Sequence, residues 1–149
     1  MVLNDGRLLL IVDGRCVLCS RSVRFIIRRD PEERFLFADR ESECAQNILR
    51  TYGLHRPESV VLIAGEHAYL KSGAAIEILS RLRGFRWAAT LLQCIPEGIR
   101  ERFYDRVARN RYRWFGRETA CYHPDDACRH RFLSREACEQ LLINPREAP

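Results

Sequence analysis

The chain has 149 residues, of which 46% are hydrophobic and 30% charged, and a formal net charge of +5 at pH 7; this predicts one soluble globular domain over residues 1–149. No apolar run approaches the roughly 18 residues of a membrane span, and the first residues lack the basic stretch and cleavage site of a secretion signal. We therefore expect a cytoplasmic protein without a membrane partner.

The first predicted strand, residues 8–12, is a continuous apolar run, as in strands buried on both faces of a sheet. Helical spacing of apolar residues begins at Cys16 and continues through Cys19 to residue 29. Two cysteines three apart at a strand-to-helix junction are typical of a thioredoxin-like redox motif. We expect Cys16 to lie at the helix end, nearer solvent, and Cys19 to face the core. The unpaired N–H groups and the dipole of the helix start favour a thiolate at Cys16.

Strand and helix patterns alternate up to residue 83. Strands are expected at 34–38, 60–63 and 67–70, and helices at 42–52 and at 73–82, the last one capped by Ser72. The order β-α-β-α-β-β-α predicts an α/β fold with a four-stranded mixed sheet, because a β-α-β unit gives parallel neighbours and a hairpin adds antiparallel strands. This is the order of the thioredoxin core, here over residues 7–83.

The remaining sequence predicts a helical extension over residues 86–142. Helices are expected at 86–94, 97–115 and 134–142, with a polar loop at 117–133. An apolar stripe in the longest helix should pack on the core; it contains Ile99, Phe103, Val107 and Phe115. Arg111 interrupts this stripe.

Seven cysteines occur, and an odd number argues against a framework of structural disulfides. We expect Cys44, Cys94 and Cys138 to be small buried hydrophobic residues.

The segment Asp13-Gly14-Arg15-Cys16-Val17-Leu18-Cys19 resembles the Asp-x-x-Cys-x-x-Cys motif of the DCC family of predicted thiol-disulfide oxidoreductases. Similarity to that family extends to residues 60–63, 69–75, 95–96, 104–116, 121 and 131–132. The resemblance covers about residues 7–133 and implies a thioredoxin-like fold and protein-disulfide reductase activity.

The predicted reaction is thiol-disulfide exchange without a cofactor, on a disulfide-containing protein or a small thiol compound. Cys16 attacks the substrate disulfide and Cys19 then resolves the mixed disulfide. Arg15 is expected to lower the pKa of Cys16 and to contact substrate. Asp13 is expected either to accept the proton of Cys19 or to bond the backbone of the turn. The sequence does not identify the substrate or the reductant that regenerates the dithiol.

Two other kinds of binding are open alternatives. Ser59 and Ser72 are candidate substrate contacts, and the helix that starts at Ser72 would present its N-terminus to a carboxylate in a glutathione-dependent enzyme. A zinc-binding module would take its ligands from Cys16 and Cys19 together with a second cluster, Cys121, His123, Cys128 and His130. The spacing of the last four is uncommon for zinc, so we predict no metal site.

A third alternative, an RNA-binding module, rests on the aromatic residues that alternate with arginines near the end of the long helix. These aromatic residues are Tyr112, Trp114 and Phe115. Because the apolar stripe assigns most of them to the core, nucleic-acid binding is not favoured.

Overall fold

The computed structural model describes residues 6–55, 57–117, 126–134 and 136–137. The first part of the chain forms β1 (Leu8–Val12), α1 (Val17–Arg29), β2 (Phe35–Asp39), α2 (Glu43–Thr51), β3 (Val61–Ala64), β4 (His67–Leu70) and α3 (Lys71–Arg81). It is followed by α4 (Arg86–Gln93), α5 (Glu97–Phe115) and the 3₁₀-helix η1 (Asp126–Arg131). The predicted element order from β1 to α5 is confirmed, with ends that differ by one or two residues.

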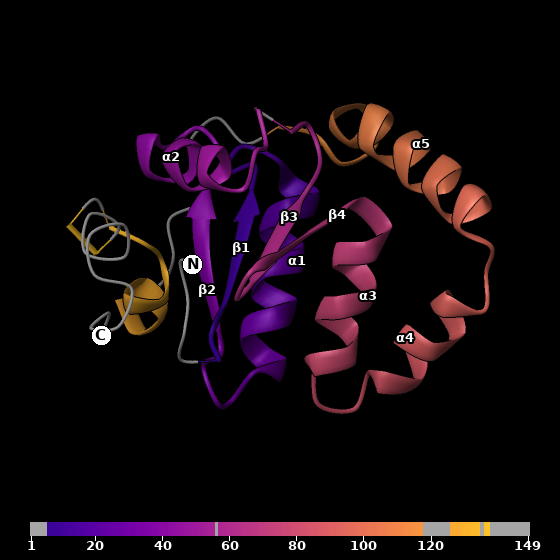
Figure 1. Ribbon diagram of the computed structural model, residues 1–149, viewed down its shortest axis with the longest axis horizontal. Coiled ribbons are helices and arrows are strands. Elements are labelled where there is room, and N and C mark those ends of the chain that lie inside the picture. Colours follow the sequence, from indigo (N-terminus) through magenta and orange to yellow (C-terminus); the bar gives the residue numbers. More distant parts are fainter. Residues whose placement is uncertain (1–5, 56, 118–125, 135, 138–149) are drawn as a thin grey trace.

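The four strands form one mixed sheet in the order β2-β1-β3-β4 (Figure 1). β1 pairs in parallel with β2, where Leu10 faces Phe37, and antiparallel with β3, where Leu10 faces Leu62. The hairpin adds β4 antiparallel to β3. Every residue of β1 is buried, as the continuous apolar run predicts for a central strand. The α/β fold with a four-stranded mixed sheet is therefore confirmed.

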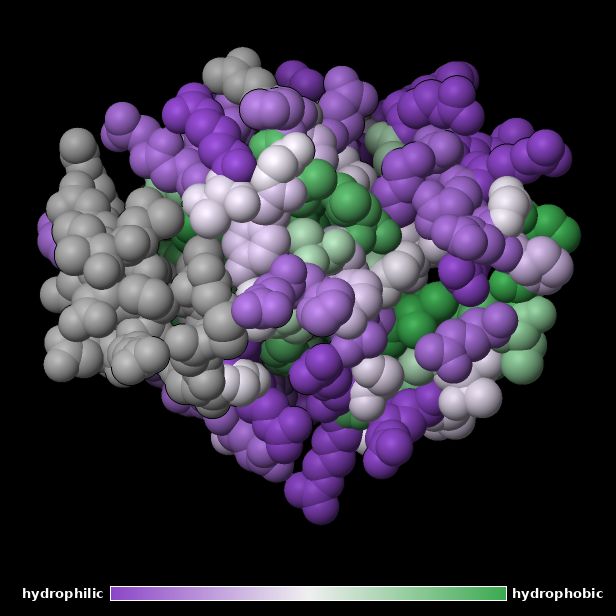
Figure 2. Space-filling view, viewed as in Figure 1, coloured by the Kyte–Doolittle hydropathy of each residue, from purple (hydrophilic) through white to green (hydrophobic). Residues whose placement is uncertain are grey.

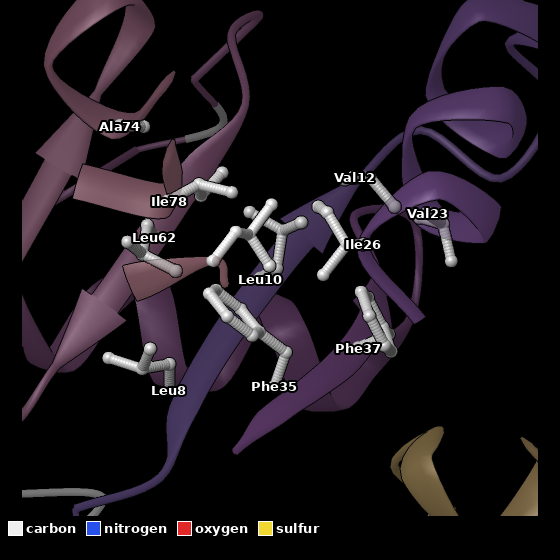
Figure 3. Close-up of a cluster of buried hydrophobic side chains, with 11 residues drawn as sticks. Leu8, Leu10, Val12, Val23, Ile26, Phe35, Phe37, Leu62, Ala74 and Ile78 are labelled. Carbon is white, nitrogen blue, oxygen red and sulfur yellow. The ribbon is translucent and has the colours of Figure 1, made fainter. Parts of the chain in front are cut away.

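Helices cover both faces of the sheet, because alternate residues of each strand point in opposite directions. Leu9 and Ile11 of β1 pack with the buried face of α2. Leu10 points to the other face, where α1 and α3 pack on the sheet. Figure 3 shows Leu10 and Phe35 from the sheet close to Ile26 of α1. This packing fixes the position of α1, whose first turn follows directly after the end of β1.

The apolar stripe predicted for α5 is not buried. Ile99 and Phe103 are 60% and 69% exposed, and no residue of α5 is fully buried. Among the described elements, α5 makes its main contacts with α3 and α1 and lies away from the sheet. Figure 2 shows hydrophilic side chains gathered over the region of α5, at the upper right of the view. The inner side of α5 presents polar groups, including Tyr104 and Arg111, toward the end of the sheet.

The segment predicted as a polar loop contains η1, which attaches to the outer strand β2. Arg131 is 3% exposed; it forms an ion pair with Asp30 and donates to the carbonyl of Phe35 at 3.1 Å. Phe132 forms a β-bridge with Phe37. These buried contacts with residues about a hundred positions away explain why local sequence signals did not predict this helix. The helix predicted at 134–142 lies largely outside the described residues.

Among the helices that the structure describes, none is long and apolar enough to cross a membrane.

Candidate active site

The two cysteines of the motif lie at the start of α1, where β1 ends. Cys16 is the N-cap residue of α1, and its carbonyl accepts the N–H of Ser20 at 2.9 Å. Cys19 lies in the first turn, one turn from Cys16, and both are free thiols. The thiol of Cys19 and the backbone N–H groups of Leu18 and Cys19 face the sulfur of Cys16 and favour its thiolate form, which lowers its pKa. The prediction that Cys16 occupies a helix start is confirmed.

The predicted exposure of the two thiols is wrong. Cys16 has 0% exposed surface, whereas Cys19 is half-buried. The main chain at Arg117, just after α5, forms an antiparallel β-bridge with Cys16. This contact joins residues a hundred positions apart, so the helical stripe alone gave no sign of it.

The two thiols have opposite pKa shifts. The hydrogen bond from Cys19 is the largest influence on Cys16; burial opposes it, but the N–H groups and the charge of Arg111 add to it, and the pKa of Cys16 falls from 9.0 to about 6. The same hydrogen bond, burial and the negative charge of Cys16 raise the pKa of Cys19. Cys16 is thus the thiolate of the pair at neutral pH, and Cys19 keeps its proton.

Ionisation of Cys16 should therefore be visible well below the ordinary range of a thiol. As the pH rises through about 6, the proton leaves Cys16; below this value the thiolate is lost. We expect the ultraviolet absorbance of the thiolate to rise with a midpoint near pH 6, which needs no reagent to reach the buried sulfur. The Cys16→Ser variant should lack this transition. A midpoint near 9.0, the ordinary value, would contradict the assignment.

Arg111 of α5 is the cation that acts on both thiols. Its guanidinium donates to the carboxylate of Asp13 at 3.2 Å and to the carbonyl of Glu58 at 3.2 Å. Burial alone would lower the pKa of Arg111, but the hydrogen bond and charge of Tyr112 and the charges of the two cysteines raise it, so it stays positive. Sequence reasoning did not assign Arg111 to the site, although it interrupts the apolar stripe of α5 and lies in the segment 104–116 that resembles the family.

Asp13 is the buried anion that holds the side chains of Arg111, Arg40 and Tyr112 in place. Its carboxylate accepts hydrogen bonds from Arg111, from Arg40 at 3.2 Å and from the hydroxyl of Tyr112. Burial raises the pKa of Asp13, but the Tyr112 hydroxyl, the N–H of Arg15 and the two arginines together hold it below the ordinary value. A carboxyl group with a lowered pKa is a weak proton acceptor.

The residues next to Asp13 shape the turn. Arg15 donates its backbone N–H to Asp13 at 3.0 Å, so Asp13 does bond the backbone of the turn. The sequence predicts that the side chain of Arg15 lowers the pKa of Cys16. In the structure the cation that lowers this pKa is Arg111 instead. A Cβ atom at Gly14 would lie 2.8 Å from the carboxylate of Asp39, so a larger residue here would displace the Asp39 side chain.

Of the two predicted serine contacts, one lines a groove beside the dithiol. Ser59 is buried and forms part of the groove between α5 and the junction of β4 with α3. Ser72 is not the cap of α3, which begins at Lys71 after Leu70. The hydroxyl of Ser72 donates to the carboxylate of Glu101, so a carboxylate of the chain itself already lies at the N-terminus of α3.

Among the described residues, the other predicted ligands and thiols form no metal-binding group with the dithiol. Within the described ranges, no group of three or more His, Cys, Asp and Glu residues could hold a metal ion. His130 pairs with Glu33 at 2.9 Å, while Cys121 and His123 lie outside the described residues. The expectation of small buried thiols is wrong at Cys44, which is disulfide-bonded, and at Cys94, which is exposed at the end of α4. Cys138 lies outside the described residues.

Comparison with known proteins identifies the family of the chain. The chain is 39% identical over 126 residues to the protein YuxK of Bacillus subtilis (strain 168), an alignment that covers 83% of this chain and 92% of that protein. It is 33% identical over 121 residues to a chloroplastic DCC family protein of Arabidopsis thaliana, covering 79% of this chain and 70% of that protein. No solved structure gives a significant match. The family model described as DCC1-like thiol-disulfide oxidoreductase matches residues 10–117, from β1 to Arg117, which is bridged to Cys16. The chain belongs to this family.

Proposed function

We propose that the protein reduces disulfides by dithiol exchange, with Cys16 as the attacking thiol and Cys19 as the resolving thiol. The observation that carries this proposal is the hydrogen-bonded thiol pair at the start of α1, in which the pKa of Cys16 is lowered to about 6 and that of Cys19 is raised. A stable thiolate beside a protonated partner is the arrangement that two-step exchange requires. The name of the family supports the same general chemistry.

The reaction has two steps. The Cys16 thiolate attacks one sulfur of the substrate disulfide, forms a mixed disulfide and releases the other sulfur as a thiolate. Cys19 then loses its proton and attacks the Cys16 sulfur, which releases the second substrate thiol. The protein ends with a Cys16–Cys19 disulfide, so two electrons have passed to the substrate, and an external thiol must return them.

The raised pKa of Cys19 fits its role in the second step. The causes of the raised pKa are, in order, the hydrogen bond to Cys16, burial and the negative charge of Cys16. The first and the third disappear when Cys16 becomes part of a mixed disulfide, whereas burial remains. Arg111 then favours ionisation of Cys19. The pKa of Cys19 therefore falls after Cys16 has reacted, which favours its attack in the second step.

Access to Cys16 requires local movement. Cys16 has no exposed surface, so a substrate reaches its sulfur only after residues around it move, and the segment bridged to it at Arg117 is one such neighbour. Gly116 has a φ of +87°, a conformation that favours glycine. The turn at Gly116 therefore directs the chain so that Arg117 pairs with Cys16.

We test this proposal by steady-state reduction of two disulfides, bis(hydroxyethyl) disulfide and a disulfide-bonded protein, with an external thiol as reductant. The wild-type protein should accelerate reduction of at least one of them, and the Cys16→Ser variant should fall to the uncatalysed rate. A Cys94→Ser variant is the matched control, because Cys94 is exposed and lies outside the motif. Equal rates for the wild-type and Cys16→Ser proteins would refute the proposal.

A further inference from the structure

We infer that the substrate is a low-molecular-weight disulfide that carries carboxylate groups, held in the groove between α5 and the β4–α3 junction. This inference rests on the proposed function and assigns its substrate class. The groove has a volume of about 1080 Å³, which is in the size range of small-molecule sites. Its lining runs from Glu97 near the start of α5 to Arg117, whose main chain is bridged to Cys16. One end of the groove is therefore next to the dithiol.

The end of the groove that is far from the dithiol has an excess of negative charge, because its lining includes Glu97, Glu101 and Asp105 against Lys71 and Arg100. Lys71 forms ion pairs with Glu101 at 3.7 Å and with Asp105 at 2.9 Å. Glu101 also accepts from the hydroxyl of Ser72, so it occupies the start of α3. A substrate carboxylate would meet negative charge there, and this end is not where it binds.

The end of the groove near the dithiol has an excess of positive charge. Arg109 and Arg117 line it, and among the described residues neither has a carboxylate within ion-pair distance. Arg109 donates only to a main-chain carbonyl of its own helix, that of Asp105. The guanidinium of Arg117 lies over the ring of Tyr112, 4.1 Å from its centre. Both guanidinium groups therefore retain donors for a ligand.

Arg40 and Arg111 add to this positive charge. Both contact Asp13, and Arg40 also lies 3.9 Å from the exposed carboxylate of Glu41. The Nε atom of Arg111 is buried and has no hydrogen-bond partner within the described part of the chain. The four arginines at this end thus exceed the carboxylates of Asp13, Glu41 and Glu58 by one charge.

This charge distribution favours a ligand whose negative groups lie a short distance from its disulfide. Guanidinium groups bind carboxylates through charge-assisted hydrogen bonds, and a cleft with one excess charge concentrates ligands of the opposite sign. A disulfide with a carboxylate two or three bonds from the sulfur would place the anion on Arg109 or Arg117 when the sulfur approaches Cys16. Neutral and cationic disulfides lack this attraction.

A matched series of disulfides tests the inference. Dithiodipropionate, bis(hydroxyethyl) disulfide and cystamine share two-carbon arms and carry two negative, no and two positive charges. The kcat/KM of each is divided by its rate with dithiothreitol, which removes differences in intrinsic reactivity. We expect dithiodipropionate to be preferred over the neutral disulfide by about tenfold at low salt, from two exposed ion pairs, and cystamine to be the poorest substrate. The preference should decrease as salt is added.

Two variants locate the preference. Arg109→Gln combined with Arg117→Gln should bring the ratio of the normalised kcat/KM values for the anionic and the neutral disulfide close to one. The combination of Arg106→Gln with Arg113→Gln removes the same charge from exposed positions of α5 that do not line the groove, and it should leave the ratio unchanged. Equal losses in both double variants would show that net charge alone sets the ratio, and the site would be refuted.

A redox-independent measurement separates this inference from the proposed function. Suberate has the length of dithiodipropionate but no disulfide, and in an NMR titration it should shift the amide signals of residues that line the groove, around Arg109 and Tyr112. If suberate binds there but no disulfide is reduced, the proposed function fails and the anion site stands. If the neutral disulfide is reduced as well as the anionic one and suberate causes no shifts, the inference fails and the proposed function stands.

Discussion

The Cys19→Ser variant is expected to accumulate mixed disulfides with its substrate, because the attack by Cys16 is retained and the release step is lost. The serine hydroxyl can still donate a hydrogen bond to Cys16, which is the largest cause of the lowered pKa of that thiol. Cys16 should therefore remain a thiolate at neutral pH. Mass spectrometry of the trapped species should place the substrate on Cys16. The Cys16→Ser variant should trap nothing, and a partner bound to Cys19 in that variant would reverse the assigned roles.

The Cys19→Ala variant separates the two roles of Cys19. Alanine removes the resolving thiol and the hydrogen-bond donor together, so the pKa of Cys16 should rise toward 9.0. The attack rate at pH 7 should fall by no more than about fourfold, since the less acidic thiol is also a stronger nucleophile. The ultraviolet titration is thus the sensitive readout. An unchanged midpoint in Cys19→Ala would show that another group sets the pKa of Cys16.

The Asp13→Asn variant is expected to lose about 3–5 kcal/mol of the free energy of unfolding, the usual effect of removing one partner from a buried ion pair. The large value is expected because Asp13, Arg111 and Arg40 are only 6%, 12% and 15% exposed. Asparagine would leave both arginines without their buried carboxylate. Denaturant unfolding measures the loss.

Two comparisons show whether this loss comes from the buried charges. Asp126→Asn removes one partner of an exposed pair with Arg129, whose side chains are 93% and 70% exposed, and it should cost less than about 1 kcal/mol. Adding Arg111→Met to Asp13→Asn should restore part of the stability, since one unpaired buried charge is removed. If Asp13→Asn is as stable as the wild-type protein and only slows resolution, Asp13 acts instead as the proton acceptor of Cys19.

The sheet and the position of the dithiol could be predicted from the sequence because both depend on local patterns. The apolar run of β1 identified a central strand, and the change to helical spacing after it placed Cys16 at a helix start. The parallel and antiparallel neighbours of β1 follow from the order of the elements.

The surroundings of the dithiol could not be predicted in this way. Cys16 is bridged to Arg117, and its charged neighbour Arg111 comes from a helix almost a hundred residues later. The prediction that the apolar stripe of α5 packs on the core was wrong, because an amphipathic pattern shows that a helix has two faces but not which face packs against the protein. Here the inner face carries Arg111 and Tyr104, while Phe103 is exposed.

The most direct measurement for the central claim is a map of the disulfide formed when the reduced wild-type protein has turned over one equivalent of a small disulfide. Free thiols are blocked in acid, and the protein is digested and analysed by mass spectrometry without reduction. The account predicts a Cys16–Cys19 disulfide together with two equivalents of released substrate thiol. Free Cys16 and Cys19 after the substrate has been consumed, or a disulfide of Cys16 with any other cysteine, would contradict it.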